Sequence, residues 1–487
     1  MKMIKMALLG GAAVAVTAAS AQADELEALK AQMAELNARM AAMETAPSIP
    51  SGYQLVAVSE GELQETPGLG FSARERMAYG NRSTIISVLP TADAPAGAII
   101  SWSGYARAGL VYNSVDTDLT IEDRVDDAAP FEEVEVTGAD DDDDIDVKAR
   151  GQIRVKASTD TAVGEVGVDV RIRANFDGVE SEGDDFYMDV AYGYWAMTPE
   201  LTFGGGYAGS LGEVGFSYDA SCTCHYIDTV GFNPGDTTQM RLSYASGPFS
   251  MAIALEDGSL KSSAFGSELA SMSGDQLGAA GEIKYSGDTF SAEVAGMWRG
   301  LEDDDEATPF EEEFLPDSWW QVGAGFSFGL SDMATFNIAA ALGEGPTVAI
   351  GEDGSGTNGV NFANPWNNQW WGVSGLVSVN LSDEVHAELG AGYIRREFDD
   401  VTADFDLDPG VAADLVETEF SAESDRWVIG GGMYYNPVDQ LTVGIEASYA
   451  VINVEGEADA VDVADTDVKA ELEQNSFTVD LVSVWRF

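Results

Sequence analysis

Hydrophobic and polar residues alternate with a period of two through residues 99–487. In residues 476–487, for example, Phe477 and Val479 fall on one face of an extended chain, and Thr478 falls on the other. Strict alternation of this kind is typical of β-strands with one apolar and one polar face. The pattern therefore predicts an all-β fold for this part of the chain.

The connections between the predicted strands fall into two classes that alternate along the chain. Seven are short turns, near Asp160, Pro199, Gly247, Gly287, Ser331, Ser382 and Asn436. Eight are long loops that are acidic or rich in glycine, at residues 115–145, 177–184, 208–236, 258–273, 301–317, 343–366, 398–424 and 454–474. Together they join sixteen strands.

A soluble β-sandwich would also show alternation, but its turns would not sort into a short and a long set. Short turns on one side, long loops on the other, and an apolar outside around a polar inside are features of membrane barrels. A barrel in lipid must also close, because lipid cannot satisfy an open sheet edge. The prediction for residues 99–487 is a sixteen-stranded antiparallel transmembrane β-barrel.

The first 23 residues have the pattern of an export signal. Lys2 and Lys5 precede an apolar run, which ends at the small-x-small sequence Ala21-Gln22-Ala23. The mature chain is expected to begin at Asp24, so the protein is exported.

Residues 24–46 switch to a helical pattern. An a/d heptad series is formed by Leu26, Leu29, Met33, Leu36, Met40 and Met43, and Pro47 ends it. The pattern predicts a short coiled coil that associates chains, or one amphipathic helix lying on the barrel or on a membrane surface. Residues 47–98 are expected to be a connecting segment with two strands, at residues 53–58 and 84–89.

The net charge and the hydrophobic content of the chain exclude two classes of protein. The chain has 84 acidic and 24 basic residues, a formal net charge of −60, with 45% hydrophobic residues. Phosphate recognition rests on clustered cations, so no nucleic-acid partner is expected. The hydrophobic content also excludes an acidic disordered chain.

Three stretches resemble a known family. They are the terminal Phe487 with alternating hydrophobic residues before it, residues 100–112 (ISWSGYARAGLVY) and residues 239–244 (QMRLSY). The first resembles the C-terminal signal of Gram-negative outer-membrane proteins, and the other two resemble strands of alphaproteobacterial general porins. The resemblance implies a trimeric diffusion porin, a homotrimer in the outer membrane that passes small hydrophilic solutes and ions. The helical segment at residues 24–46 departs from that family.

Scarce cations concentrate on the polar faces of the first three predicted strands: Arg107, Lys148, Arg150, Arg154, Lys156, Arg171 and Arg173. On the lipid side each would cost about 2–4 kcal/mol at the middle of the bilayer. This face is therefore expected to line the lumen as a basic wall.

The third long loop, residues 208–236, is expected to fold inward, as the resemblance implies. Its acidic residues are Glu213, Asp219, Asp228 and Asp236. Opposite the basic wall they would create a transverse field at a constriction and set charge selectivity. The alternative is that the arginines pair with acidic groups as scaffold.

Cys222 and Cys224, the only cysteines, flank one residue near the tip of that loop and precede His225. An oxidising periplasm favours a local disulfide. A metal site is less favoured, because no fourth ligand is evident.

The external loops carry most of the negative charge, including the run Asp140, Asp141, Asp142, Asp143 and Asp144. Dense carboxylates suit weak Ca²⁺ or Mg²⁺ binding and bridging to lipopolysaccharide. A solvated acidic surface is an equal alternative. No cofactor is required.

Other function classes fit less well. With two histidines and no readable Ser/His/acid constellation, no enzyme is expected. A trimeric adhesin would have a long stalk before a short barrel segment, and a receptor with a plug domain would need more residues before the barrel. The closer alternative is a substrate-selective channel for a sugar or for an anion such as phosphate.

Overall fold

The computed structural model describes one compact unit, within Val56–Leu89 and Ala94–Phe487. The described residues are 56–88, 97–125, 132–136, 142–177, 186–215, 224–225, 227, 229–257, 260–261, 271–272, 277–300, 318–331, 333–345, 369–406, 415–460 and 466–487. The predicted signal peptide, residues 1–23, and the predicted coiled coil, residues 24–46, lie outside them and stay predictions.

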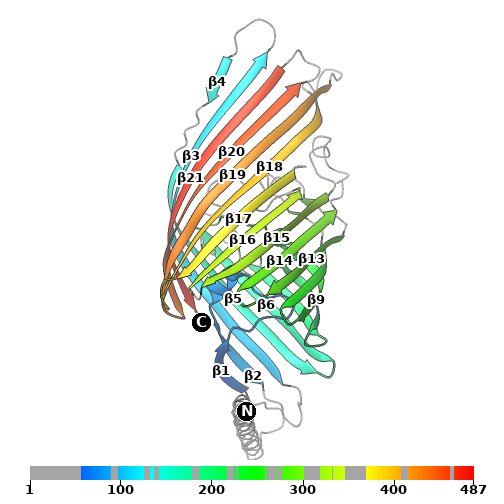
Figure 1. The fold of residues 1–487 in the computed structure, drawn as a ribbon, viewed down its shortest axis with the longest axis vertical. Helices are drawn as coiled ribbons and strands as arrows, with labels where there is room; N and C mark the ends of the chain where they lie inside the picture. The colour runs from blue at the N-terminus through cyan, green and yellow to red at the C-terminus, as the bar shows by residue number, and fades with distance from the viewer. Residues whose placement is uncertain are drawn as a thin grey trace, which may run out of the picture. The chain divides into compact units, whose positions relative to one another are not determined.

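Sixteen antiparallel strands form a closed barrel, which confirms the predicted architecture (Figure 1). Each strand pairs with the next along the chain, and the last pairs with the first. They are β3 (Ala98–Val125), β5 (Asp142–Thr161), β6 (Gly164–Asp177), β7 (Phe186–Ala196), β8 (Leu201–Gly209), β9 (Asp236–Ser246), β10 (Phe249–Asp257), β13 (Leu277–Ser286), β14 (Phe290–Gly300), β15 (Ser318–Ser331), β16 (Ala334–Glu344), β17 (Gln369–Asn380), β18 (Val385–Asp406), β19 (Leu415–Val438), β20 (Leu441–Ala460) and β21 (Thr466–Arg486).

The predicted turns fall at or within a few residues of tight connections, such as Gly247 between β9 and β10. The predicted long loops are partly strand. β20 runs to Ala460 and β21 begins at Thr466, inside the loop expected at residues 454–474. The sequence pattern predicts loops here because the residues are acidic. They are acidic because the strands continue beyond the apolar region. Smaller strands in the described residues are β4 (Glu132–Val136), on β3, and the pair β11 (Leu260–Lys261) and β12 (Ser271–Met272).

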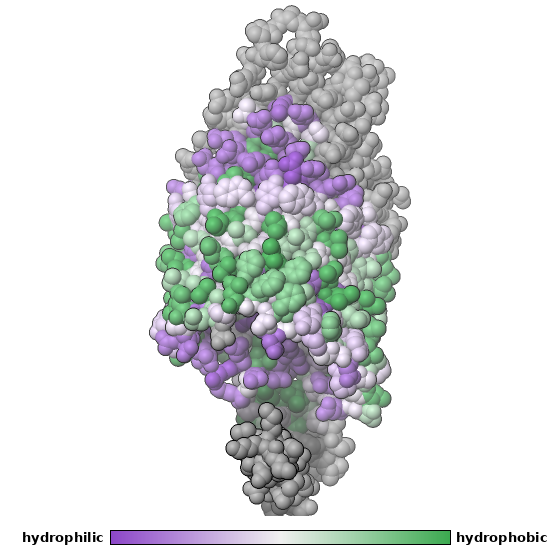
Figure 2. Space-filling view, viewed as in Figure 1, coloured by the Kyte–Doolittle hydropathy of each residue, from purple (hydrophilic) through white to green (hydrophobic). Residues whose placement is uncertain are grey.

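The two faces of the barrel wall differ as predicted. On β10, Met251 and Ile253 are 51% and 65% exposed, whereas Ala252 and Ala254 are buried. Figure 2 shows a hydrophobic band around the middle of the visible face, with hydrophilic residues above and below it. No helix among the described residues is long and apolar enough to cross a membrane.

The described part of the region expected as a connecting segment, residues 56–88 and 97–98, belongs to the same compact unit as the barrel. β1 (Val56–Glu62) and β2 (Arg82–Val88) form an antiparallel hairpin, overlapping the two strands predicted there. Between them, residues 63–81 leave the hairpin and return to it, and they contain α2 (Ala73–Tyr79). We call residues 63–81 the inner arm.

One edge of β3 is shared by two strands. β2 pairs with it from Ala98 to Trp102, and β21 pairs with it from Tyr105 onward. At the junction, the Phe487 N–H donates to the Gly104 carbonyl at 3.1 Å, and the Gly104 N–H donates to the Phe487 carbonyl at 3.3 Å. The hairpin therefore continues the barrel wall beyond the end of β21.

Candidate functional site

The cations of the predicted basic wall lie together on the buried face of β3, β5 and β6. In register, Arg107 on β3 faces Arg150 on β5, and Arg154 on β5 faces Arg171 on β6. Like charges at facing positions repel, so the arrangement needs carboxylates beside it. All seven predicted cations are buried: Arg107, Lys148, Arg150, Arg154, Lys156, Arg171 and Arg173.

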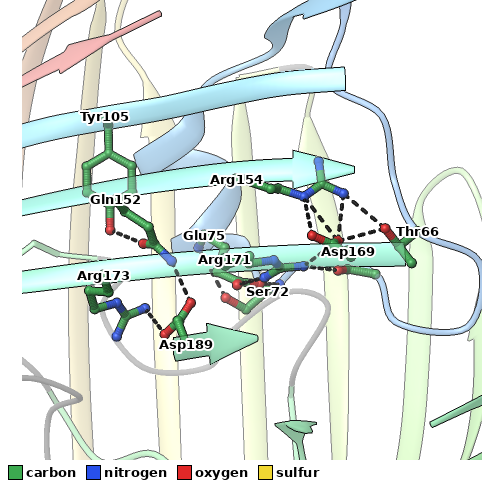
Figure 3. A network of polar contacts seen from close by, with 11 residues as sticks. Thr66, Ser72, Glu75, Tyr105, Gln152, Arg154, Asp169, Arg171, Arg173 and Asp189 are labelled. Atoms are coloured by element: carbon green, nitrogen blue, oxygen red, sulfur yellow. Dashed lines mark hydrogen bonds and ion pairs between the residues drawn. The ribbon is translucent and has the colours of Figure 1, made fainter. Parts of the chain in front are cut away.

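Asp169 on β6 supplies a carboxylate to two of these arginines. Arg154 donates to it from Nε at 3.0 Å and from Nη2 at 2.8 Å, and Arg171 donates to it from Nη2 at 3.4 Å (Figure 3). The Thr66 hydroxyl donates to the same carboxylate at 2.7 Å. Removing one partner of such a buried pair would leave an uncompensated charge, so Asp169 is what permits the burial of these arginines.

A second network continues along the wall. Arg173 Nη2 lies 2.8 Å from Asp189 Oδ1, and Gln152 Nε2 donates to Asp189 Oδ2 at 2.5 Å. The Tyr105 hydroxyl donates to Gln152 Oε1 at 2.6 Å (Figure 3). The acid that offsets Arg173 therefore comes from β7, next to it in the sheet.

The inner arm lies against this wall and accepts hydrogen bonds from it. Lys156 Nζ donates to the Glu65 carbonyl oxygen at 2.6 Å, and Arg241 Nη1 on β9 donates to the Gly68 carbonyl oxygen at 2.8 Å. Arg154 Nη2 donates to the Thr66 hydroxyl at 3.0 Å. Wall cations thus bind three successive parts of the arm.

Phe71 brings an aromatic ring to the same place. It is 1% exposed, and the guanidinium carbons of Arg154 and Arg171 lie 4.5 and 4.6 Å from the centre of its ring. A desolvated cation over an aromatic ring gains about 2 kcal/mol. The buried ring therefore stabilises the charge of these two arginines.

The carboxylate of Glu75 joins the arm's helix to the wall. α2 begins with a capping box, in which Ser72 Oγ accepts from the Glu75 N–H at 3.1 Å and Glu75 Oε2 accepts from the Ser72 N–H at 2.9 Å. The other oxygen, Oε1, forms an ion pair with Arg171. One side chain therefore starts the helix and offsets a wall cation.

The third loop packs against the opposite part of the wall. The side chains of Val214, Val230 and Phe232 belong to one buried cluster with wall residues that include Ala339 and Trp370. At its start the loop is held by polar contacts as well.

Those polar contacts centre on Glu256 of β10. Its carboxylate accepts from Ser210 Oγ at 2.8 Å and from the Leu211 N–H at 3.1 Å, and it pairs with Arg299 at 2.9 Å. The loop is thus tied both to apolar wall positions and to a buried ion pair.

His225, near the tip of this loop, is 2% exposed, and its backbone N–H donates to Glu446 at 2.7 Å. Burial, followed by the field of Arg107, lowers the pKa of the His225 imidazole well below its usual range. In the arm, burial raises the pKa of the Tyr79 hydroxyl well above its usual range. Both groups are therefore neutral near pH 7.

Two of the four predicted loop acids lie among the described residues. Glu213 interacts electrostatically with Lys284 of β13, and Asp236 begins β9. Asp219 and Asp228 lie outside the described residues, so an acidic side of the constriction stays a prediction. Arg154, Arg171 and Arg173 form ion pairs with Asp169 and Asp189 of the wall and with Glu75 of the arm.

The other predicted sites lie only partly within the described residues. Cys224 is buried and is not a free thiol, and Cys222 lies outside the described residues, so the disulfide stays a prediction. Asp140 and Asp141 also lie outside, Asp142 starts β5, and Asp143 accepts from the Tyr112 hydroxyl at 3.0 Å. Within the described ranges no group of three His, Cys, Asp or Glu side chains could hold a metal.

Sequence reasoning missed the whole inner arm, including Thr66, Phe71 and Glu75. The sequence Ser72-Ala73-Arg74-Glu75 matches a capping box and could have located α2. Nothing in it indicates the wall as the helix's partner, because Glu75 and Arg171 are 96 residues apart in sequence.

Comparison with known proteins gives the following matches. The profile of a family described as "Porin subfamily" matches residues 99–480. No curated protein matches the sequence.

Three solved structures are similar. The outer membrane channel DcaP of Acinetobacter baumannii has 16% identity and a TM-score of 0.46, covering 82% of this chain and 99% of that one. An anion-selective porin from Comamonas acidovorans has 10% identity and a TM-score of 0.45, covering 80% and 100%. Outer-membrane expressed OmpT of Vibrio cholerae has 10% identity and a TM-score of 0.42, covering 80% and 98%.

Proposed function

Because the chain belongs to the porin subfamily, we propose that it forms a water-filled outer-membrane channel for passive diffusion of small hydrophilic solutes and ions. The observation that carries the proposal is the closed sixteen-stranded barrel with an apolar outer face and a polar, charged inner face. No catalytic step is part of this function.

The third loop and the basic wall would together set the size and charge limits of the channel. Support comes from the packing of Val214, Val230 and Phe232 against the inner wall. Arg107, Lys148 and Arg150 would supply the positive field, because all three lie on the inner face of β3 and β5.

Further parts of the proposal concern export and assembly. Residues 1–23 would direct export, and residues 24–46 would help three copies associate as a homotrimer. The acidic run at residues 140–144 would bind Ca²⁺ or Mg²⁺ weakly and bridge to lipopolysaccharide. We also propose that the chain is most similar in kind to the alphaproteobacterial general porins.

An anion-selective channel is the second candidate, and the cluster of buried cations on β3, β5 and β6 favours it. A general diffusion channel would show currents that rise in proportion to salt concentration. An anion-binding channel would saturate, and added phosphate would block its chloride current.

Reversal potentials of the purified protein in planar bilayers, measured under a KCl gradient, distinguish the general channel from the anion-selective channel. Replacing Arg107, Lys148 and Arg150 together by Gln should shift the ion preference toward cations. Absence of any channel activity in the wild type would refute the proposed function. Saturable block by one solute would replace the general channel by the selective one.

A further inference from the structure

The inner arm is closed on itself at its base. The Leu63 N–H donates to the Asn81 carbonyl oxygen at 2.9 Å, directly after the pair Glu62 and Arg82 in the hairpin register. Nineteen residues therefore leave and re-enter the hairpin at one point.

The arm meets the wall through polar and apolar contacts together. Its Thr66 and Glu75 side chains and its Glu65 and Gly68 carbonyl oxygens each bind a wall cation, as described above. Its apolar side chains are buried against the wall as well: Phe71 and Tyr79 share a cluster with Tyr105, Val482 and Val484, and Leu69 shares one with Val190 and Tyr192. The arm is therefore a packed part of the inner wall.

The charge balance of the wall depends on the arm. Arg154 and Arg171 carry two positive charges, and Asp169 and Glu75 carry two negative charges, so the group is neutral. Without Glu75 the same group has a net charge of +1. In the low-dielectric interior of a pore, one fixed charge acts strongly on passing ions.

We propose that the inner arm narrows the pore as a fixed part of its inner wall and that Glu75 is a selectivity-determining residue. With the arm in place, the channel is narrow and this part of the wall is neutral. Without the Glu75 charge, the same part of the wall is positive and favours anions. The inference rests on the proposed channel function.

The first test is Glu75→Gln. Gln still completes the capping box, so α2 keeps its start, while the charge that offsets Arg171 is lost. The ratio of anion to cation permeability should rise by about twofold or more. Glu60→Gln is the matched control, because Glu60 lies on β1, is exposed, and its ion pair with Arg82 at 3.5 Å is exposed as well.

The second test removes the arm. Because Glu62 and Arg82 are paired, residues 63–81 can be replaced by Asn-Gly, which closes a two-residue hairpin. Single-channel conductance should rise by about twofold or more, since a packed segment leaves the lumen.

The outcomes separate the two claims. If the wild type forms no channel, the proposed function fails. If the wild type conducts and the conductance and ion preference of Glu75→Gln and of the armless variant equal those of the wild type, the inference alone is overturned. Should the armless variant fail to fold, the ion preference of Glu75→Gln compared with that of Glu60→Gln decides the matter.

Discussion

Arg486, the last residue of β21, holds the end of α2: its Nη2 donates to the Met77 carbonyl oxygen at 2.7 Å and its Nε to the Ala78 carbonyl oxygen at 2.9 Å. Carbonyl groups at a helix C-terminus lack intrahelical partners, and a cation there also suits the helix dipole. Nη1 donates at the same time to Thr442 at 2.8 Å on β20. The last strand of the barrel thus fixes a helix encoded near its beginning.

Loss of this contact should loosen α2 selectively. In Arg486→Gln we expect a local loss of about 1–3 kcal/mol, because charge-assisted hydrogen bonds of the buried carbonyls are removed. Amide hydrogen exchange of residues 73–80 should accelerate by about tenfold or more, while β-strand amides keep their protection. Arg395→Gln, at a more exposed cluster of ion pairs on β18, is the control and should leave α2 unchanged. Equal exchange in both variants would contradict the role of Arg486.

Phe71 should stabilise the arm in its inward position. Phe71→Ala removes a buried ring beneath two guanidinium groups and should cost about 3–5 kcal/mol of arm stability. Trypsin can report this, since Arg74 and Arg76 lie in α2 and the helix must open before cleavage. Cleavage should become about 100-fold faster or more. Phe249→Ala, at a 56% exposed site on the outer face, should not change the rate.

The third loop depends on small residues in the wall behind it. A Cβ at Gly392 of β18 would come within 2.5 Å of the Val230 Cβ, so Gly392→Ala should cost about 1–3 kcal/mol by overpacking. A lower midpoint of urea unfolding in micelles would record this. At Gly375 of β17 the nearest atom lies at an ordinary 3.5 Å, so Gly375→Ala is a control without a clash. Val230→Gly removes the Cβ that the new methyl group would meet, so in the Val230→Gly background the further loss caused by Gly392→Ala should be smaller. An equal loss in both backgrounds would disprove the contact.

Acid should weaken the packing of the third loop through His225. The unfolded chain binds a proton at this group below about pH 6.5, whereas burial keeps the folded group neutral to lower pH. The contribution of His225 to the free energy of unfolding is therefore fully present above that pH. It falls as the pH drops toward the depressed pKa of the folded state, by about 1.4 kcal/mol per pH unit for one proton. His225→Leu should remove this part of the slope of unfolding free energy between about pH 6.5 and 5. An unchanged slope would show that other groups cause it.

The barrel could be predicted because its signal is local and repeated. Every strand carries the same alternation, and the inward parity of Arg154 and Arg171 follows from the cost of placing a cation in lipid. The same argument located the buried cations without any knowledge of their partners.

The partners could not be predicted, because they depend on long-range contacts. Residue spacing does not show which of the 84 acidic residues would pair with the wall cations. The structure places Asp169 from the wall and Glu75 from a segment with short strands beside Arg154 and Arg171. The inner arm has little periodicity, so its position is set by the wall that receives it.

The shared edge of β3 has a consequence for how the barrel is completed. In a β-sheet, a shift of pairing by one residue turns every side chain to the opposite face. β2 takes the first positions of this edge, Ala98 to Trp102, and the C-terminal end of the last strand pairs at Tyr105 and Gly104. The hairpin thus blocks a shift of the closing strand toward the start of β3, and only a shift in the other direction remains sterically open.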